Sequence, residues 1–302
     1  MQKTRSLALA SLFAGACAIG TSAVLVKLSD VGPVSSAFWR VALAVPVLAL
    51  WAHLADGRPA GGHPRTSRTL LFLCGLFFAG DLAFWHWSIV LTSVANATLL
   101  ANCAPIFVTL AAWLFFRRTP RAQFVVGLAT AMAGTALLLH GDFRHSGAAL
   151  VGDALGIVTA MFYAAYQLAV TRARRQISTA RIMFVSGAVT ASLLLPLALF
   201  SGERFLPQTA AGWLPLLGLA LIAQVGGQSL IACAMAHLPA TFSSVGLLLQ
   251  PVVAAALAWA VLSEALTPLA IVGGVLVLIG IRVAHGAQSE EKPGSDPEKT
   301  GV

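Results

Sequence analysis

The chain has 302 residues, of which 58% are hydrophobic and only 10% are charged, and its mean hydropathy is +0.85. A water-soluble protein of this composition would lack the polar surface that covers a core, so we exclude that class and expect the lipid bilayer as the solvent. The formal charge of +8 would favour nucleic acid as the partner of a soluble protein. We expect no nucleic-acid partner, because the basic residues sort by connection as they do in membrane proteins.

Ten apolar segments are each long enough to cross a bilayer as a helix, which takes about 20 residues. In chain order they cover about residues 6–26, 34–54, 69–90, 95–116, 122–140, 148–170, 181–200, 213–236, 240–262 and 268–285. The connections 56–68 and 201–212 are rich in glycine, proline and polar residues and are predicted surface loops. The tail 287–302 is predicted to be disordered and cytoplasmic. The sequence therefore predicts an all-α integral membrane protein with ten transmembrane helices.

The basic residues alternate between the two sides of the predicted bundle. If the amino terminus lies in the cytoplasm, most of the 19 lysines and arginines fall in cytoplasmic connections. The opposite side then holds only Lys27, Arg144 and Arg204, while Arg40 lies within a span. The positive-inside rule therefore predicts that both termini are cytoplasmic, in a multi-pass protein of the cell membrane.

The chain contains an internal repeat at a spacing of 146 residues. The matched residues are those that interrupt apolar runs, namely Pro105 with Pro251, Trp113 with Trp259, Gly127 with Gly273, and Gly134 with Gly280. Because each half has five helices, an odd number, the halves cross the bilayer in opposite senses. We expect a first repeat over 1–140 and an inverted second repeat over 141–286. Inverted repeats are typical of secondary transporters, whose substrate site lies near the midplane between the halves.

Two charged residues within the predicted spans are candidate site residues, because such residues are costly in a membrane. Asp81 lies about 18 Å along its span, near the midplane, where a carboxyl group can carry a proton through a transport cycle. It is the candidate proton-coupling residue, and the alternative is a structural aspartate held by an interhelical hydrogen bond or salt bridge. Three roles stay open for Arg40: pairing with Asp81, binding an anionic group of the substrate, or reaching to the external interface.

Further candidate substrate-binding residues are aromatic or neutral and polar. Trp85 shares a helix face with Asp81, whereas His86, a possible proton relay, does not. The others are Asn96, Asn102, Tyr163, Tyr166, Gln167, Gln224, Gln228, Ser243, Ser244 and Gln250. Any one of them could be explained by an interhelical hydrogen bond of about 0.6 kcal/mol. Together they exceed that need, and we predict a polar central cavity.

Several stretches resemble the drug/metabolite transporter superfamily, specifically its EamA-type members. They are 93–107 and its counterpart 238–251, then 262–264 with the helix of Gly273 and Gly280, and Lys27, Gly32, Pro33 and Arg40 around the first two spans. The resemblance covers about residues 6–285 and implies a carrier of small solutes with two inverted five-helix repeats. One position departs from that pattern: the family commonly has a glutamate in both halves, whereas this chain has Arg118 in the first half and Glu264 in the second.

No sequence motif for soluble chemistry is present: there is no Walker loop, no dinucleotide glycine fingerprint, no His-Glu-x-x-His and no nucleophile elbow. Four cysteines, Cys17, Cys74, Cys103 and Cys233, show no paired spacing for a disulfide or a metal. We therefore expect no enzyme, no cofactor and no metal. The predicted function is secondary transport, specifically export, of a small metabolite by alternating access, with a small-molecule substrate and the lipid bilayer as partners. An intramembrane enzyme for lipid-linked groups and a non-transporting scaffold subunit are the alternatives, and the choice between monomer and homodimer stays open.

Overall fold

The computed structural model describes residues 2–56, 65–92, 94–117, 119–139 and 147–289. Within these ranges the regular structure is entirely helical, as the composition predicts. The elements are α1 Gln2–Gly20, α2 Ser22–Leu28, α3 Pro33–Ala42, α4 Ala44–Asp56, α5 Arg65–Leu91, α6 Val94–Ala101, α7 Ala104–Phe116, α8 Ala122–Leu138, α9 Gly147–Ala173, α10 Thr179–Phe200, α11 Trp213–Gly218, η1 Leu219–Gln228, α12 Ser229–Ala234, α13 Ala240–Gly246, α14 Leu249–Leu262 and α15 Pro268–Ser289.

Consecutive helices join into membrane-spanning units. Among the described residues, nine apolar units are long enough to cross a bilayer, and α8, with 17 residues, is a shorter apolar helix between them. The predicted ten-helix architecture is therefore confirmed. The last helix continues to Ser289, three residues into the predicted disordered tail, and 290–302 lie outside the described residues.

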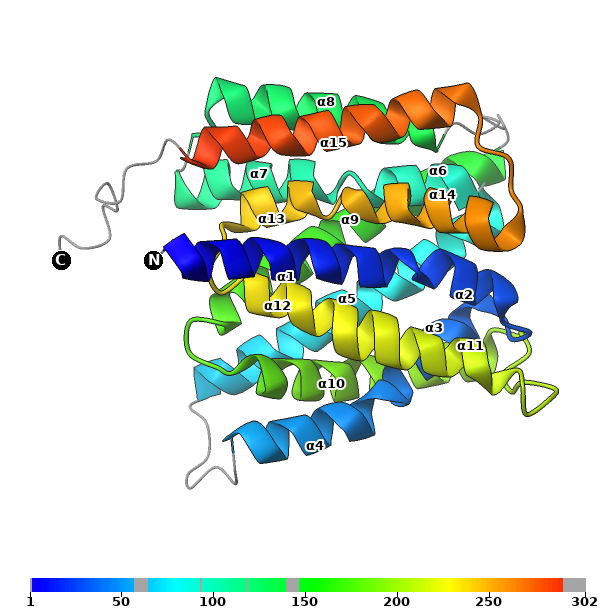
Figure 1. The fold of residues 1–302 in the computed structure, drawn as a ribbon. Helices are drawn as coiled ribbons and strands as arrows, with labels where there is room; N and C mark the ends of the chain where they lie inside the picture. The colour runs from blue at the N-terminus through cyan, green and yellow to red at the C-terminus, as the bar shows by residue number, and fades with distance from the viewer. Residues whose placement is uncertain (1, 57–64, 93, 118, 140–146, 290–302) are drawn as a thin grey trace.

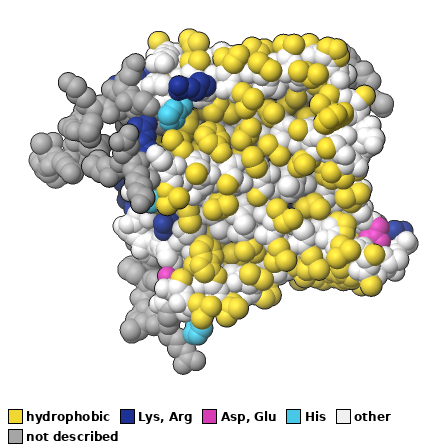
Figure 2. Space-filling view, in the orientation of Figure 1, with side chains coloured by type: hydrophobic (Ala, Val, Ile, Leu, Met, Phe, Trp, Pro, Cys, Tyr) yellow, Lys and Arg dark blue, Asp and Glu magenta, His cyan; other side chains and the backbone are white. Residues whose placement is uncertain are grey.

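The helices lie side by side with their axes along one direction, and the start of α1 and the end of α15 lie at the same end of the bundle (Figure 1). Figure 2 shows a hydrophobic surface along the bundle, with lysine and arginine side chains gathered at the left end. We call this the basic end; it holds the start of α1, the α7–α8 and α9–α10 connections, and the end of α15. The opposite end holds the α2–α3, α10–α11 and α14–α15 connections. This separation of charge is typical of a protein that spans a membrane.

Helices α8 and α15 meet along a seam of glycines. A Cβ atom added to Gly127 would lie 2.8 Å from the carbonyl oxygen of Gly280, and one added to Gly134 would lie 2.6 Å from that of Gly273. The pairing runs antiparallel, since the earlier residue of one helix meets the later residue of the other. Gly127 thus contacts Gly280, the repeat counterpart of Gly134, and Gly134 contacts Gly273, the repeat counterpart of Gly127. A two-fold axis between inverted halves produces this relation.

The seam gives a direct stability prediction. We expect Gly273→Ala to lower the melting temperature of the purified protein, because the new methyl would lie 2.5 Å from the backbone nitrogen of Leu138 and 2.6 Å from the carbonyl oxygen of Gly134, which cannot rotate away. Overpacking of this kind costs about 1–3 kcal/mol. Gly274→Ala is the matched control, because its nearest neighbour beyond its own turn lies 3.6 Å away. Equal melting temperatures for the two variants would contradict the seam.

The fourth and ninth helices of the sequence prediction also show the repeat in their backbone. Arg117 ends α7 with φ of 50°, and Ser263, 146 residues later, ends α14 with φ of 55°. The fourth span is broken between α6 and α7, and the ninth is broken between α13 and α14. Pro105 and Pro251 follow these breaks, and each lacks the N–H that would continue the helical hydrogen bonds. The same interruption of the helix therefore recurs in both halves of the chain.

Candidate functional site

Arg40 is the third residue from the end of α3, a helix whose first turn is held by a loop from the other half of the chain. The carboxylate of Glu203 accepts a hydrogen bond of 2.9 Å from the backbone nitrogen of Val34, in the first turn. A carboxylate at this position satisfies a free N–H group and complements the helix dipole. Trp39 Nε1 donates to the carbonyl oxygen of Phe205 at 2.8 Å. These contacts of the 201–212 loop fix the rotation of α3, which turns Arg40 toward η1.

Two opposite charges are brought together in the interior. Arg40 on α3 and Asp81 on α5 are within electrostatic range of each other. Arg40 Nε also donates a hydrogen bond of 3.1 Å to Gln224 Oε1 on η1. The structure therefore places the two charges in one region of the interior, and pairing between Arg40 and Asp81 stays a prediction.

The chain's only two tyrosines face this pair from α9. The rings of Tyr163 and Tyr166 are stacked, with centroids 6.2 Å apart and planes inclined by 16°, and Phe78 stacks on the far side of Tyr166 at 4.8 Å. Both phenol groups lie within electrostatic range of Arg40 and Asp81. The arrangement places an aromatic surface next to one positive and one negative charge.

Two glutamines connect the tyrosines to the second half. Gln228 Nε2 donates to the hydroxyl oxygen of Tyr166 at 3.5 Å, and Gln250 on α14 is a neighbour of the Tyr163 hydroxyl. We call the connected set the central polar network: Arg40, Asp81, Tyr163, Tyr166, Gln224, Gln228 and Gln250. Its members come from α3 and α5 of the first half and from α9, η1 and α14 of the second. The network therefore lies where the two halves meet.

The sequence did not predict the helix type that carries two members of this network. η1 is a π-helix of ten residues, in which Gln224 and Gln228 are 1% and 2% exposed. π-Helical turns are rare and occur frequently at functional sites. Gly226 and Gly227 lie within it, and glycine lowers the resistance of a helix to such a distortion, but this signal is too common to identify a π-helix from sequence.

His86 and Trp85 lie beyond this network on α5. His86 is buried, and its Nδ1 lies 2.5 Å from the carbonyl oxygen of Leu82, one turn earlier in its own helix. Trp85 packs edge-on against it, with ring centroids 5.0 Å apart. His86 is within electrostatic range of Arg40, but the partner of its Nδ1 is backbone rather than Asp81. The relay between Asp81 and His86 stays a prediction.

The remaining predicted residues divide into two groups. Asn102 Nδ2 and Ser244 Oγ donate to carbonyl oxygens of their own helices, those of Thr98 at 2.8 Å and Thr241 at 2.7 Å. Asn96, Gln167 and Ser243 are buried. Among the described residues, some buried polar atoms have no hydrogen-bond partner: both amide atoms of Gln167, Ser243 Oγ, Gln228 Oε1 and Gln250 Nε2. Such atoms are costly to bury, and they are rare outside sites that bind something polar.

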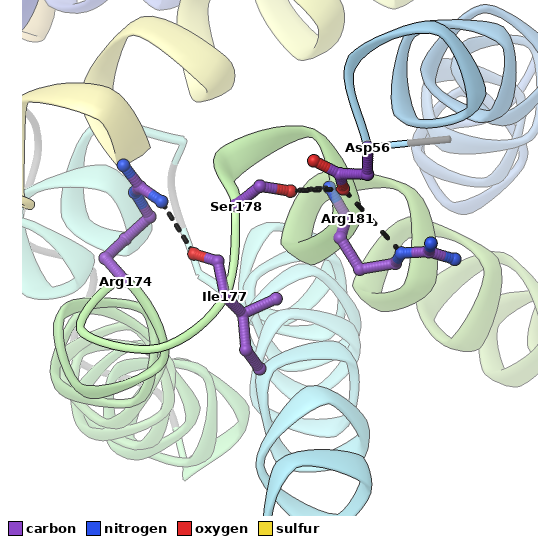
Figure 3. Close-up of polar contacts among 5 residues, drawn as sticks. All are labelled: Asp56, Arg174, Ile177, Ser178 and Arg181. Atoms are coloured by element: carbon purple, nitrogen blue, oxygen red, sulfur yellow. Dashed lines mark hydrogen bonds and ion pairs between the residues drawn. The ribbon is translucent and has the colours of Figure 1, made fainter. Parts of the chain in front are cut away.

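Ion pairs join the two halves at both ends of the bundle. At the basic end, Asp56 at the end of α4 accepts a hydrogen bond of 2.5 Å from Ser178 Oγ and pairs with Arg181 Nε at 3.8 Å, both at the start of α10 (Figure 3). Beside them, Arg174 Nη1 donates to the carbonyl oxygen of Ile177. At the opposite end, Lys27 pairs with Glu264. Neither ion pair was predicted, because the partners of each are far apart in sequence.

Comparisons with known proteins agree with this architecture. The sequence profile of the EamA-like transporter family matches residues 6–140 and again 150–284. The chain is 28% identical over 211 residues to the pseudopaline exporter CntI of Pseudomonas aeruginosa, covering 70% of this chain and 72% of that protein. It is 29% identical over 268 residues to a probable terminal-alkyne amino-acid exporter of Streptantibioticus cattleyicolor, covering 87% of each.

One further relative and one solved structure extend the comparison. An uncharacterized transporter of Archaeoglobus fulgidus is 25% identical over 275 residues, covering 88% of this chain and 92% of that protein. A solved crystal structure shares the fold, with a TM-score of 0.80 at 20% identity, covering 95% of this chain and 99% of the other. The family profile matches each half separately and accounts for most of the sequence. The chain therefore belongs to the EamA-like transporter family.

Proposed function

We propose that the protein exports a small zwitterionic metabolite of the amino-acid type and that the central polar network binds it. The observation that carries this proposal is the meeting of Arg40 and Asp81, one charge of each sign, at the contact between the two halves. In carriers built from inverted repeats, the substrate site lies at that place. The names of two relatives, the pseudopaline exporter and the probable terminal-alkyne amino-acid exporter, support export of this class of solute.

Each part of a zwitterion has a matching group. The guanidinium of Arg40 binds a carboxylate through two parallel hydrogen bonds, and the carboxylate of Asp81 binds an ammonium group. The stacked rings of Tyr163 and Tyr166 offer an apolar and aromatic surface to the body of the substrate. Further polar contacts are supplied by the side-chain atoms that lack a hydrogen-bond partner, namely both amide atoms of Gln167 and Oε1 of Gln228. Around this site we propose the polar cavity and the alternating access that the sequence predicted.

Competition for Asp81 provides a simple way to couple the substrate to protons. A proton that enters from outside and binds Asp81 would remove the negative charge that holds the substrate ammonium, and the substrate would leave. Loss of the proton to the cytoplasm would restore the charge for the next substrate molecule. This exchange of proton for substrate follows from one carboxylate that cannot hold both. We infer that Asp81 is the coupling residue.

The basic end is proposed to face the cytoplasm, with both termini there, and with halves bounded as predicted at 1–140 and 141–286. Described basic residues on the helix ends and connections of this end are Arg5, Arg68, Arg117, Arg121, Arg172, Arg174, Arg175 and Arg181. The positive-inside rule supports this orientation. A fluorescent tag at the carboxyl end tests this orientation. Loss of its signal when a membrane-impermeant quencher is added outside intact cells would reverse the assignment.

The decisive experiment uses purified protein in liposomes loaded with a panel of the common amino acids. We expect efflux of at least one of them, accelerated when the pH outside is lower than the pH inside. The same incubations are analysed by mass spectrometry, because an intramembrane enzyme would change its substrate chemically, whereas a carrier would not. Absence of flux across the whole panel, under every gradient, would contradict the proposed substrate class.

A further inference from the structure

The hydrogen bond between Arg40 and Gln224 uses one particular edge of the guanidinium. Arg40 Nε donates to Gln224 Oε1 at 3.1 Å, and Gln224 is only 1% exposed. A guanidinium has five N–H donors in a rigid plane, one on Nε and four on the two terminal nitrogens. With Nε held by the amide, the plane of the group is fixed and the terminal nitrogens are left for a carboxylate.

The position of Gln224 depends on the π-helical form of η1. This segment is pressed against α1 through two glycines, because a Cβ on Gly227 would lie 2.7 Å from Ile19 Cγ1, and one on Gly15 would lie 2.8 Å from the carbonyl oxygen of Gly227. The backbone of η1 is therefore fixed on one side by α1. It also packs against α3, the helix that carries Arg40. Gln224 is held between a fixed backbone and the guanidinium.

We propose that Gln224, presented by the π-helix η1, is a positioning residue for Arg40. It holds Nε so that the two terminal nitrogens are left to bind the carboxylate of the substrate. The part that concerns the substrate rests on the proposed function; the part that concerns Arg40 does not. An unoriented guanidinium would still carry its charge, but it would lose the two-point geometry that makes arginine selective for carboxylates.

The first test observes Arg40 directly. In protein labelled with ¹⁵N-arginine, the Nε–H signal of Arg40 is assigned by its disappearance in Arg40→Gln. We expect this signal to be protected from hydrogen exchange in the wild type, to lose that protection at least tenfold in Gln224→Met, and to keep it in Gln224→Glu, which retains an acceptor. Gln228→Met is the matched control, because Gln228 lies on the same π-helix but donates to Tyr166. Protection that persists in Gln224→Met would overturn the proposal.

The second test measures transport of L-phenylalanine and L-phenylalaninamide, which differ in the charge of the carboxyl group. For Gln224→Met we expect the KM of L-phenylalanine to rise about tenfold, with kcat and the KM of the amide nearly unchanged. In the Arg40→Gln background the same substitution should have no further effect, since coupled residues are not additive. Additive effects would overturn the positioning role. If exchange protection behaves as expected but the wild type moves neither probe nor any amino acid of the panel, the positioning role stands and the proposed function fails.

Discussion

Arg40→Gln is expected to raise the KM for an amino-acid substrate by about 10–100-fold in the liposome assay, because each charge-assisted hydrogen bond contributes about 1.5–3 kcal/mol. Glutamine keeps a polar side chain of similar length but cannot hold a carboxylate by two parallel charged hydrogen bonds. The matched amide substrate should be transported with nearly the same KM by both proteins. The measurement is initial efflux rate against substrate concentration.

The control for this prediction is Arg204→Gln at the opposite end of the bundle. Arg204 is exposed, donates to the backbone carbonyl oxygen of Asp30, and is not a member of the central polar network. Its removal tests whether any loss of positive charge affects transport. An unchanged KM in Arg40→Gln would take Arg40 out of the binding site and leave it a structural partner of Asp81.

Asp81→Asn is expected to abolish acceleration of efflux by a pH gradient while exchange of substrate between the two sides of the membrane continues. Asparagine has nearly the shape of aspartate but neither binds a proton at this site nor carries a charge. We expect the gradient-driven rate to fall at least tenfold and to become independent of pH between 5 and 8, as in a carrier whose single coupling group has been removed. The paired readings are net efflux with a gradient and isotope exchange without one.

The matched control is Asp153→Asn. Asp153 is also an aspartate on a membrane helix, but it accepts a hydrogen bond of 2.8 Å from Thr92 near the opposite end. It should remain coupled to the gradient. Should Asp81→Asn keep the pH dependence of the wild type, the proton role belongs to another residue.

Sequence patterns predicted the parts of the fold that repeat or that face lipid. Span lengths, the charge alternation and the 146-residue repeat are all properties of the chain itself, and Gly127 and Gly134 could be expected to pack closely from their spacing alone. In the structure these two glycines pack against Gly280 and Gly273 of α15. The sequence did not predict where the helices within a span break. For example, α1 and α2 meet at Thr21, inside a continuous apolar run. Tertiary packing decides such breaks, and sequence patterns do not record it.

The sequence predicted the residues of the candidate site better than the contacts between them. Arg40 and Asp81 stood out because charge in a membrane is costly, and their proximity was one of three open arrangements. Asn102 and Ser244 were grouped with them, but their side chains donate hydrogen bonds to backbone carbonyl oxygens a few residues earlier in the chain. Polar side chains commonly form such local bonds, and sequence does not reveal which of them do. The link from Arg40 to Gln224 depends on a π-helix, and Glu203 reaches α3 from a loop that sequence marked only as surface.

The glycine seam has a consequence for how the carrier changes shape. Backbone touches backbone along α8 and α15, so sliding one past the other would bring carbonyl oxygens into collision. We therefore expect α8 and α15 to move as one rigid unit. Because exchanging the two halves maps this pair onto itself, the pair favours tilting toward either face of the membrane equally. Any difference in stability between the inward and outward forms would then arise outside the seam, and the two ends of the bundle do differ, with Asp56 and Arg181 paired at one and Lys27 and Glu264 at the other.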